Sequence, residues 1–164
     1  MKYLLAYSLP LIAFIGIYFG GFWTYSGVVF AFGILPVLEL ILPTDEKNHT
    51  EAEIENKLKN HFFDVLLYLN IFIVYGMLFF VLHKVSTEHL SFSEIIGTVL
   101  SLGVVLGANG INVAHELGHR EKLYERIIGK LLLIPSHYTH FFIEHNHGHH
   151  LHVSTPEDPS TAKY

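Results

Sequence analysis

The stretch that decides the fold runs from residue 95 to residue 119 and reads IIGTVLSLGVVLGANGINVAHELGH. Its first part, residues 95–114, carries no charge, and about 20 such residues are what an α-helix needs to cross a bilayer. Small residues recur close to small-xxx-small spacing, which lets membrane helices approach closely: Gly97, Gly103, Gly107 and Gly110. The stretch therefore predicts a membrane-spanning helix that ends at a pair of histidines.

Three further apolar segments precede this one, and each is long enough, or nearly so, to span a membrane. We expect them at residues 3–19, 22–42 and 62–82. The polar stretch 43–61 separates the last two and is predicted to be a loop with a short solvated helix. The expected fold is an all-α, polytopic integral membrane protein, with a four-helix region at residues 1–114 and a histidine-rich segment at residues 115–164.

Composition supports a membrane protein over a soluble one. Of 164 residues, 51% are hydrophobic and 15% charged, whereas a soluble domain carries about 25% charged residues. The chain has no cysteine, which excludes disulfides, iron–sulfur clusters and cysteine-based zinc sites. It has 13 histidines, so any metal must be held by imidazole, with carboxylate or water in support. The net charge of −5 and the lack of a basic stripe argue against nucleic acid as a partner.

The distribution of lysine and arginine predicts the orientation, because loops that face the cytoplasm carry the excess of these residues. With the N-terminus inside, Lys84 in the 83–91 loop is the one basic residue outside, against nine inside. We therefore expect an inner-membrane protein whose N-terminus and histidine-rich segment are cytosolic. Residues 123–134 are apolar but interrupted by charges and too short to cross, so they are expected to form an interfacial helix.

The first histidine motif is His115-Glu116-Leu117-Gly118-His119. Residues four apart share a helix face, so both imidazoles can bind one metal ion. Such a pair is typical of a zinc protease, with Glu116 as general base, and also of a non-haem iron centre. Two solvated histidines at a helix end would look the same, so the pair alone leaves these alternatives open.

The second motif, EHNHGHH at residues 144–150, narrows the choice. In an α-helix His145 and His149 lie one turn apart on one face, and His150 is offset by about 100°. A zinc protease needs one ligand beyond its helical pair, whereas this chain offers at least three. The surplus indicates two metal ions, and ligation by nitrogen at an open site suits iron. The alternative is a surface histidine tract that binds adventitious metal.

These residues, His115-Glu-Leu-Gly-His119-Arg120, then His140-Phe-Phe-Ile-Glu-His145-Asn-His-Gly-His149-His150, then Thr155-Pro-Glu-Asp-Pro159, resemble the first two histidine boxes of the membrane-bound alkane 1-monooxygenases. The resemblance implies a di-iron centre, dioxygen, hydroxylation of the terminal carbon of an n-alkane held among membrane helices, and rubredoxin as electron donor. The iron ligands that it implies are His115, His119, His145, His149 and His150.

Other polar residues near the boxes receive weaker roles. His140 and His147 fall outside the ligand pattern, and four carboxylates are candidates to orient ligand imidazoles: Glu116, Glu144, Glu157 and Asp158. The family carries a third His-x-x-His-His box that does not occur here. We therefore expect the chain to be a fragment that lacks hydroxylase activity alone. Within the second span, the small Ala31 is expected to line the substrate channel.

Three other functions compete with this hypothesis. A fatty-acid desaturase or another lipid hydroxylase shares the chemistry, but desaturase boxes usually space the paired histidines one residue closer. An intramembrane zinc metalloprotease of the HExxH type would bind one zinc ion and no iron. A non-catalytic membrane protein that binds metal is the third alternative.

Overall fold

The computed structural model describes residues 2–42, 60–158 and 160. Within these ranges every regular element is a helix, as predicted. The short helix expected in the polar stretch 43–61 lies almost wholly outside the described residues.

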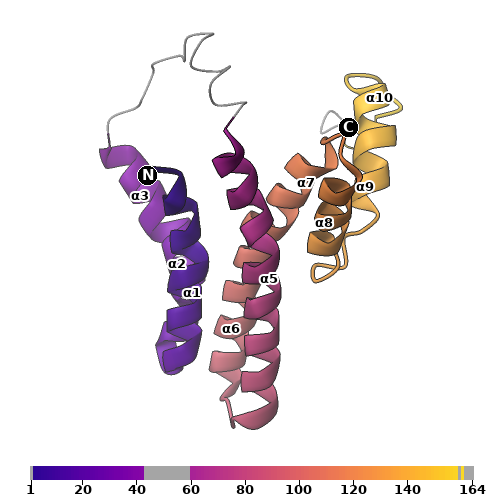
Figure 1. Ribbon diagram of the computed structural model, residues 1–164. Coiled ribbons are helices and arrows are strands. Elements are labelled where there is room, and N and C mark those ends of the chain that lie inside the picture. Colours follow the sequence, from indigo (N-terminus) through magenta and orange to yellow (C-terminus); the bar gives the residue numbers. More distant parts are fainter. Residues whose placement is uncertain (1, 43–59, 159, 161–164) are drawn as a thin grey trace.

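The N-terminal part is a hairpin of two apolar helical segments (Figure 1). The first joins a 3₁₀ helix, η1 (Lys2–Tyr7), to α1 (Ser8–Phe19). The second comprises η2 (Gly21–Tyr25), α2 (Ser26–Val29), the π-helical turn η3 (Phe30–Ile34) and α3 (Leu35–Ile41). The turn between them lies at Gly20 and Gly21, whose φ angles of 73° and 58° glycine adopts without strain.

Two long helices follow. The first, α5 (His61–Thr87), begins where the Asn60 side chain accepts a hydrogen bond from the Phe62 amide at 3.0 Å. The second begins with a capping box between Ser91 and Glu94 and consists of α6 (Phe92–Val105), the π-helical turn η4 (Leu106–Ile111) and α7 (Asn112–Gly118). This helix continues past Ala114, so His115 lies within it.

Three of the four predicted spans are helices long and apolar enough to cross a membrane: Gly21–Ile41, His61–Thr87 and Phe92–Gly118. The segment predicted as the first span, Tyr3–Phe19, is apolar but shorter in residues. The 3₁₀ helix at its start makes up for the smaller number of residues, because a 3₁₀ helix lengthens by about 2.0 Å per residue and an α-helix by about 1.5 Å. Six residues of η1 and twelve of α1 thus extend about 30 Å, close to the thickness of the hydrocarbon core.

The four segments run alternately up and down, so that the two inter-helix turns meet at one end (Figure 1). There the Gly21 amide donates a hydrogen bond to the Glu94 carboxylate at 2.7 Å. Of the glycines singled out in the sequence, Gly97 allows close packing: a Cβ there would lie 2.2 Å from Thr24 Oγ1. A Cβ at Gly103 would meet no atom within 4 Å, so close helix approach uses only part of the glycine pattern.

The opposite end of the bundle carries the remaining helices (Figure 1). The predicted interfacial segment forms α8 (Leu123–Leu133), whose Gly129 lies close to the Ala114 carbonyl of α7. A final helical run joins α9 (Phe141–Ile143), the π-helical turn η5 (Glu144–His149) and α10 (His150–His152). Turns follow to Asp158. Both histidine motifs therefore lie at one end of the molecule.

Candidate metal centre

The first motif projects from the last turn of a helix that is anchored in the core. On α7, Ala114 and Leu117 are 1% and 0% exposed and pack against Leu132 and Leu133 of α8. His115 and His119 lie on the opposite, exposed side, with ring centroids 4.8 Å apart. The predicted i, i+4 pairing is therefore confirmed, and packing of the buried face orients it.

The second motif differs from the α-helical expectation. Residues 144–149 form a π-helical turn, with backbone hydrogen bonds from residue i to i+5. In an α-helix, residues five apart diverge by about 140°, and the wider π turn reduces that angle. As a result His145 Nε2 lies 3.0 Å from His150 Nε2. Within its own motif, His145 Nε2 thus lies close to a ring nitrogen of His150, whereas the α-helical register predicts one of His149.

The two motifs meet through His119 and His145, whose Nε2 atoms are 3.3 Å apart. Ring nitrogens of His115, His119, His145 and His150 all lie within 4.8 Å of one another. The separations of 3.0 and 3.3 Å that involve His145 fit a metal ion, because with bonds of 2.0–2.1 Å ligand nitrogens lie about 3.0 Å apart at a right angle and about 3.3 Å apart in a tetrahedron. Residues 26 to 35 positions apart in the sequence thus form one group of donors, which we call the four-histidine group.

The protonation state of two of these rings, His119 and His145, suits metal binding. Burial, together with the neighbouring histidines, lowers the pKa of His145 to about 4. Burial also lowers the pKa of His119, with His115 and His150 contributing. Because a metal ion binds the neutral imidazole, both rings are in the binding form at neutral pH.

His149 does not join the group but contacts a carboxylate. Its Nδ1 lies 3.0 Å from both carboxylate oxygens of Asp158, which is 6% exposed and also accepts a hydrogen bond from the Ser160 amide. The hydrogen bond with His149 holds the pKa of Asp158 below its usual range, with the Ser160 amide adding to the effect. A charged acceptor at Nδ1 keeps the proton on that nitrogen and leaves Nε2 free to bind a metal.

Of the four candidate carboxylates, Asp158 is the one for which the described residues show a contact to a predicted ligand. Glu116 instead binds Arg120 at 3.0 Å, and Arg120 also reaches Asp64 on α5 at 3.4 Å. Glu144 lies 4.0 Å from His140 Nε2, and Glu157 is exposed. His140 lies outside the four-histidine group, as the sequence predicted.

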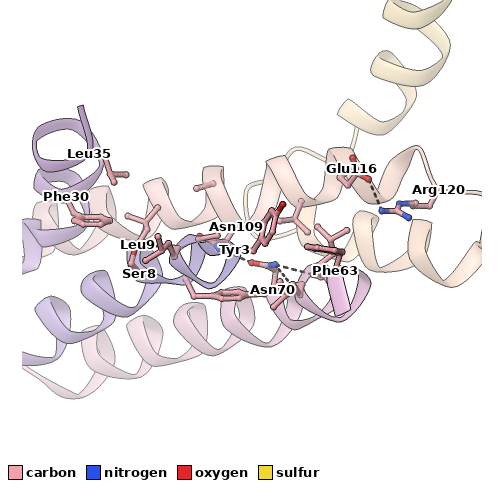
Figure 2. Close-up of a pocket in the computed structure, with 17 residues that line it drawn as sticks. Tyr3, Ser8, Leu9, Phe30, Leu35, Phe63, Asn70, Asn109, Glu116 and Arg120 are labelled. Carbon is pink, nitrogen blue, oxygen red and sulfur yellow. Dashed lines mark hydrogen bonds and ion pairs between the residues drawn. The ribbon is translucent and has the colours of Figure 1, made fainter. Parts of the chain in front are cut away.

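An apolar cavity of about 580 Å³ lies between the N-terminal segment, α5 and the η4–α7 helix (Figure 2). Glu116 and Arg120 lie toward one end, and Phe30 and Leu35 toward the other. Ala31 is not among the residues that line it but packs against a core cluster that includes Leu9 and Ala13, so its expected place along a substrate channel stays a prediction. Two residues that sequence analysis did not assign to a site, Asn70 and Asn109, line the cavity; their polar side chains inside apolar spans were the available signal.

Comparisons with known proteins agree with these observations. A family model described as fatty acid desaturase matches residues 93–164. The chain is 39% identical to an alkane 1-monooxygenase of Pseudomonas putida over 87% of this chain and 36% of that protein. It is 34% identical to alkane 1-monooxygenase 2 of Alcanivorax borkumensis over 94% of this chain and 41% of the relative.

A more distant relative is the hydroxylase component of a Pseudomonas putida xylene/toluene monooxygenase, 30% identical over 94% of this chain and 42% of that protein. The chain thus spans about a third to two fifths of the length of the curated relatives that it matches. Together with the three spanning helices, these membrane-enzyme relatives identify a multi-pass membrane protein with a metal site.

Proposed function

Because this chain is homologous to the alkane 1-monooxygenases over most of its length, we propose that it contributes to dioxygen-dependent hydroxylation of the terminal carbon of n-alkanes. The observation that carries the proposal is the four-histidine group beside the end of an apolar cavity. Glu116 links the two, since it lines the cavity and lies between His115 and His119 in the sequence.

We propose iron as the metal, held by His115, His119, His145 and His150. Nitrogen-rich ligation at an exposed position suits iron. His149 is the proposed ligand of a second iron ion, and Asp158 orients its ring so that Nε2 faces away from the carboxylate. Bound iron would supply the oxidising chemistry with dioxygen, which no side chain of this protein can supply.

The cavity residues carry out the rest of the proposed function, namely binding the alkane and excluding water. An alkane has no polar group, so its binding comes from apolar contact and its selectivity from the length of the cavity. Leu9, Phe63, Leu66 and Val113 present such a surface. At the cavity end near the histidines, Glu116 and Arg120 form an ion pair, so their charges are paired with each other where they line the cavity.

The zinc-protease alternative is not favoured. It requires Glu116 to act as general base at the metal, whereas the Glu116 carboxylate accepts a hydrogen bond from Arg120 at 3.0 Å. It also leaves His150 without a role, although this ring lies 3.0 Å from His145. The desaturase alternative is disfavoured by the relatives, which are named monooxygenases.

We further propose that rubredoxin donates the electrons and that the protein lies in the inner membrane. In this proposal residues 1–114 form the membrane region, and residues 115–164 form the cytosolic and interfacial histidine segment. The position of both motifs at one end of the bundle, opposite the 88–91 turn, supports the assignment. A cysteine at Ser86 should be labelled from outside intact cells, and one at Ser154 only after lysis; the reverse pattern would refute the orientation.

The activity is tested with the protein that carries this chain, purified and supplied with n-octane, dioxygen, rubredoxin and a reductant. We expect 1-octanol and iron as the bound metal. Toluene in place of n-octane tests whether the xylene/toluene relative is the better guide to the substrate. Zinc without iron, or no product from any hydrocarbon at full iron loading, would refute the proposed function.

A further inference from the structure

Two asparagines meet inside the apolar cavity. Asn70 of α5 and Asn109 of η4 are each 5% exposed, and both line the cavity about midway between its two ends (Figure 2). Asn109 Nδ2 donates a hydrogen bond to Asn70 Oδ1 at 2.9 Å. A polar pair in a membrane-embedded cavity is costly unless its hydrogen bonds are satisfied.

The surrounding hydrogen bonds determine which way each amide points. Asn70 Nδ2 lies 2.9 Å from the Leu66 carbonyl and 3.3 Å from the Leu67 carbonyl, so it is the donor end of that side chain. Asn70 Oδ1 must then face Asn109, which presents its own NH₂. This leaves Asn109 Oδ1 as a buried acceptor that receives no hydrogen bond.

Such an atom is rare in this molecule. Among the described residues, the buried side-chain oxygens and nitrogens without a partner are Asn109 Oδ1 and Thr98 Oγ1, and Thr98 does not line the cavity. Asn109 also lies in a π-helical turn, and π turns within α-helices are frequent at functional sites. Burial, an unused acceptor and a π turn thus coincide on one cavity wall.

We propose that Asn70 and Asn109 form a hydroxyl-binding subsite, at which Asn109 Oδ1 accepts a hydrogen bond from the O–H group of a primary aliphatic alcohol bound in the cavity. The cavity walls bind the alkyl chain, and Asn70 holds Asn109 in the accepting orientation. This inference rests on the proposed function in one respect: the alcohol is the product of that reaction. The subsite therefore distinguishes product from substrate.

The test compares two isomers that differ in one donor. 1-Octanol carries an O–H group, whereas 1-methoxyheptane has the same atoms and an ether oxygen that only accepts. Both compete with radiolabelled 1-octanol for the purified protein in lipid nanodiscs, with partition into protein-free nanodiscs subtracted. One net hydrogen bond predicts that 1-octanol displaces the label at about three- to tenfold lower concentration than the ether.

Asn109→Leu, which keeps the side-chain size but removes the acceptor, should abolish this preference. Asn112→Leu is the matched control, since Asn112 is exposed three residues further along the same helix and does not line the cavity. Equal displacement by the two isomers in the unaltered protein, or the same loss in both variants, would overturn the subsite. The comparison in the unaltered protein decides the question even where Asn109→Leu does not fold, and the assay requires no turnover, so it is independent of the proposed activity.

Discussion

The two histidine motifs bring their rings to the same point from two kinds of helix. His115 lies in, and His119 directly after, an α-helix whose other face is buried, with Leu117 0% exposed. His145 and His150 lie on a helix with a π turn, and none of the described side chains in residues 141–152 is fully buried. The first motif is therefore positioned by a fully buried helix face. The second is positioned by its own backbone geometry, by Phe141 and Phe142, which pack against the same core, and by polar contacts.

The same spacing of histidines therefore does not have the same structural consequence in both motifs. In the first, a spacing of four pairs the rings, as an α-helix requires. In the second, a spacing of five brings two ring nitrogens within 3.0 Å of each other, whereas His149, four positions on, stacks on the His145 ring but turns its Nδ1 to Asp158. Substitutions in and around each motif test this contrast.

The register of the second motif is tested by comparing two adjacent histidines. His150→Ala should lower the affinity for the first ferrous ion by at least about 100-fold, because it removes a member of the four-histidine group and losses outside the first ligand shell already cost 10–100-fold. His149→Ala should leave this affinity within about tenfold. Iron titration of the purified variants measures both, and His140→Ala is the control. Equal losses for His149 and His150 would favour the α-helical register.

The dependence of the first motif on the core is tested at Gly129 of α8. A Cβ there would lie 3.1 Å from the Ala114 carbonyl and 3.3 Å from Leu117 Cβ, so Gly129→Val overpacks the contact behind His115. We expect unfolding free energy to fall by about 1–3 kcal/mol, read from denaturant titration in detergent. Gly103→Val is the control, because a Cβ at Gly103 meets no atom within 4 Å. A similar loss in both variants would show that the α7–α8 contact is not specific.

The role of polar contacts in the second motif is tested at Asp158. Asp158→Ala removes the acceptor from His149 Nδ1 and should lower affinity for the proposed second iron ion about tenfold. Asp158→Asn should lose less, because the amide oxygen can still accept a hydrogen bond from Nδ1. Imidazole ¹⁵N shifts report the tautomer of His149 in the same samples. An unchanged tautomer in Asp158→Ala would contradict the orienting role.

The smallest effect is expected at Arg120, which ties the first motif to α5 through Asp64 and to its own helix through Glu116. These side chains are partly exposed, so Arg120→Ala should cost about 0.2–1 kcal/mol of stability. High salt should shrink the difference, since it screens exposed pairs. Thermal unfolding at two salt concentrations measures it. A loss above about 2 kcal/mol would mean that the ion pairs position the motif as strongly as the core does.

Sequence patterns alone predict the apolar helical segments, the α8 helix and both histidine motifs. Hydropathy and the α-helical period suffice for these features, because they depend on neighbouring residues and on the solvent that each face meets. The resemblance to the alkane 1-monooxygenases was likewise evident from motif residues, and the relatives confirm it.

The pairing of His145 with His150, the contact of Asp158 with His149 and the place of the cavity follow only from the tertiary structure. A π turn depends on backbone hydrogen bonds that the spacing of histidines does not reveal, so the pairing of His145 with His150 could not be predicted from an α-helical wheel. The cavity is lined by residues of η1, α5 and η4, which are far apart in the chain. Local periodicity shows which face of a helix is apolar, but not which neighbour covers it. It therefore could not predict that Phe30 lines the cavity and that Ala31 does not.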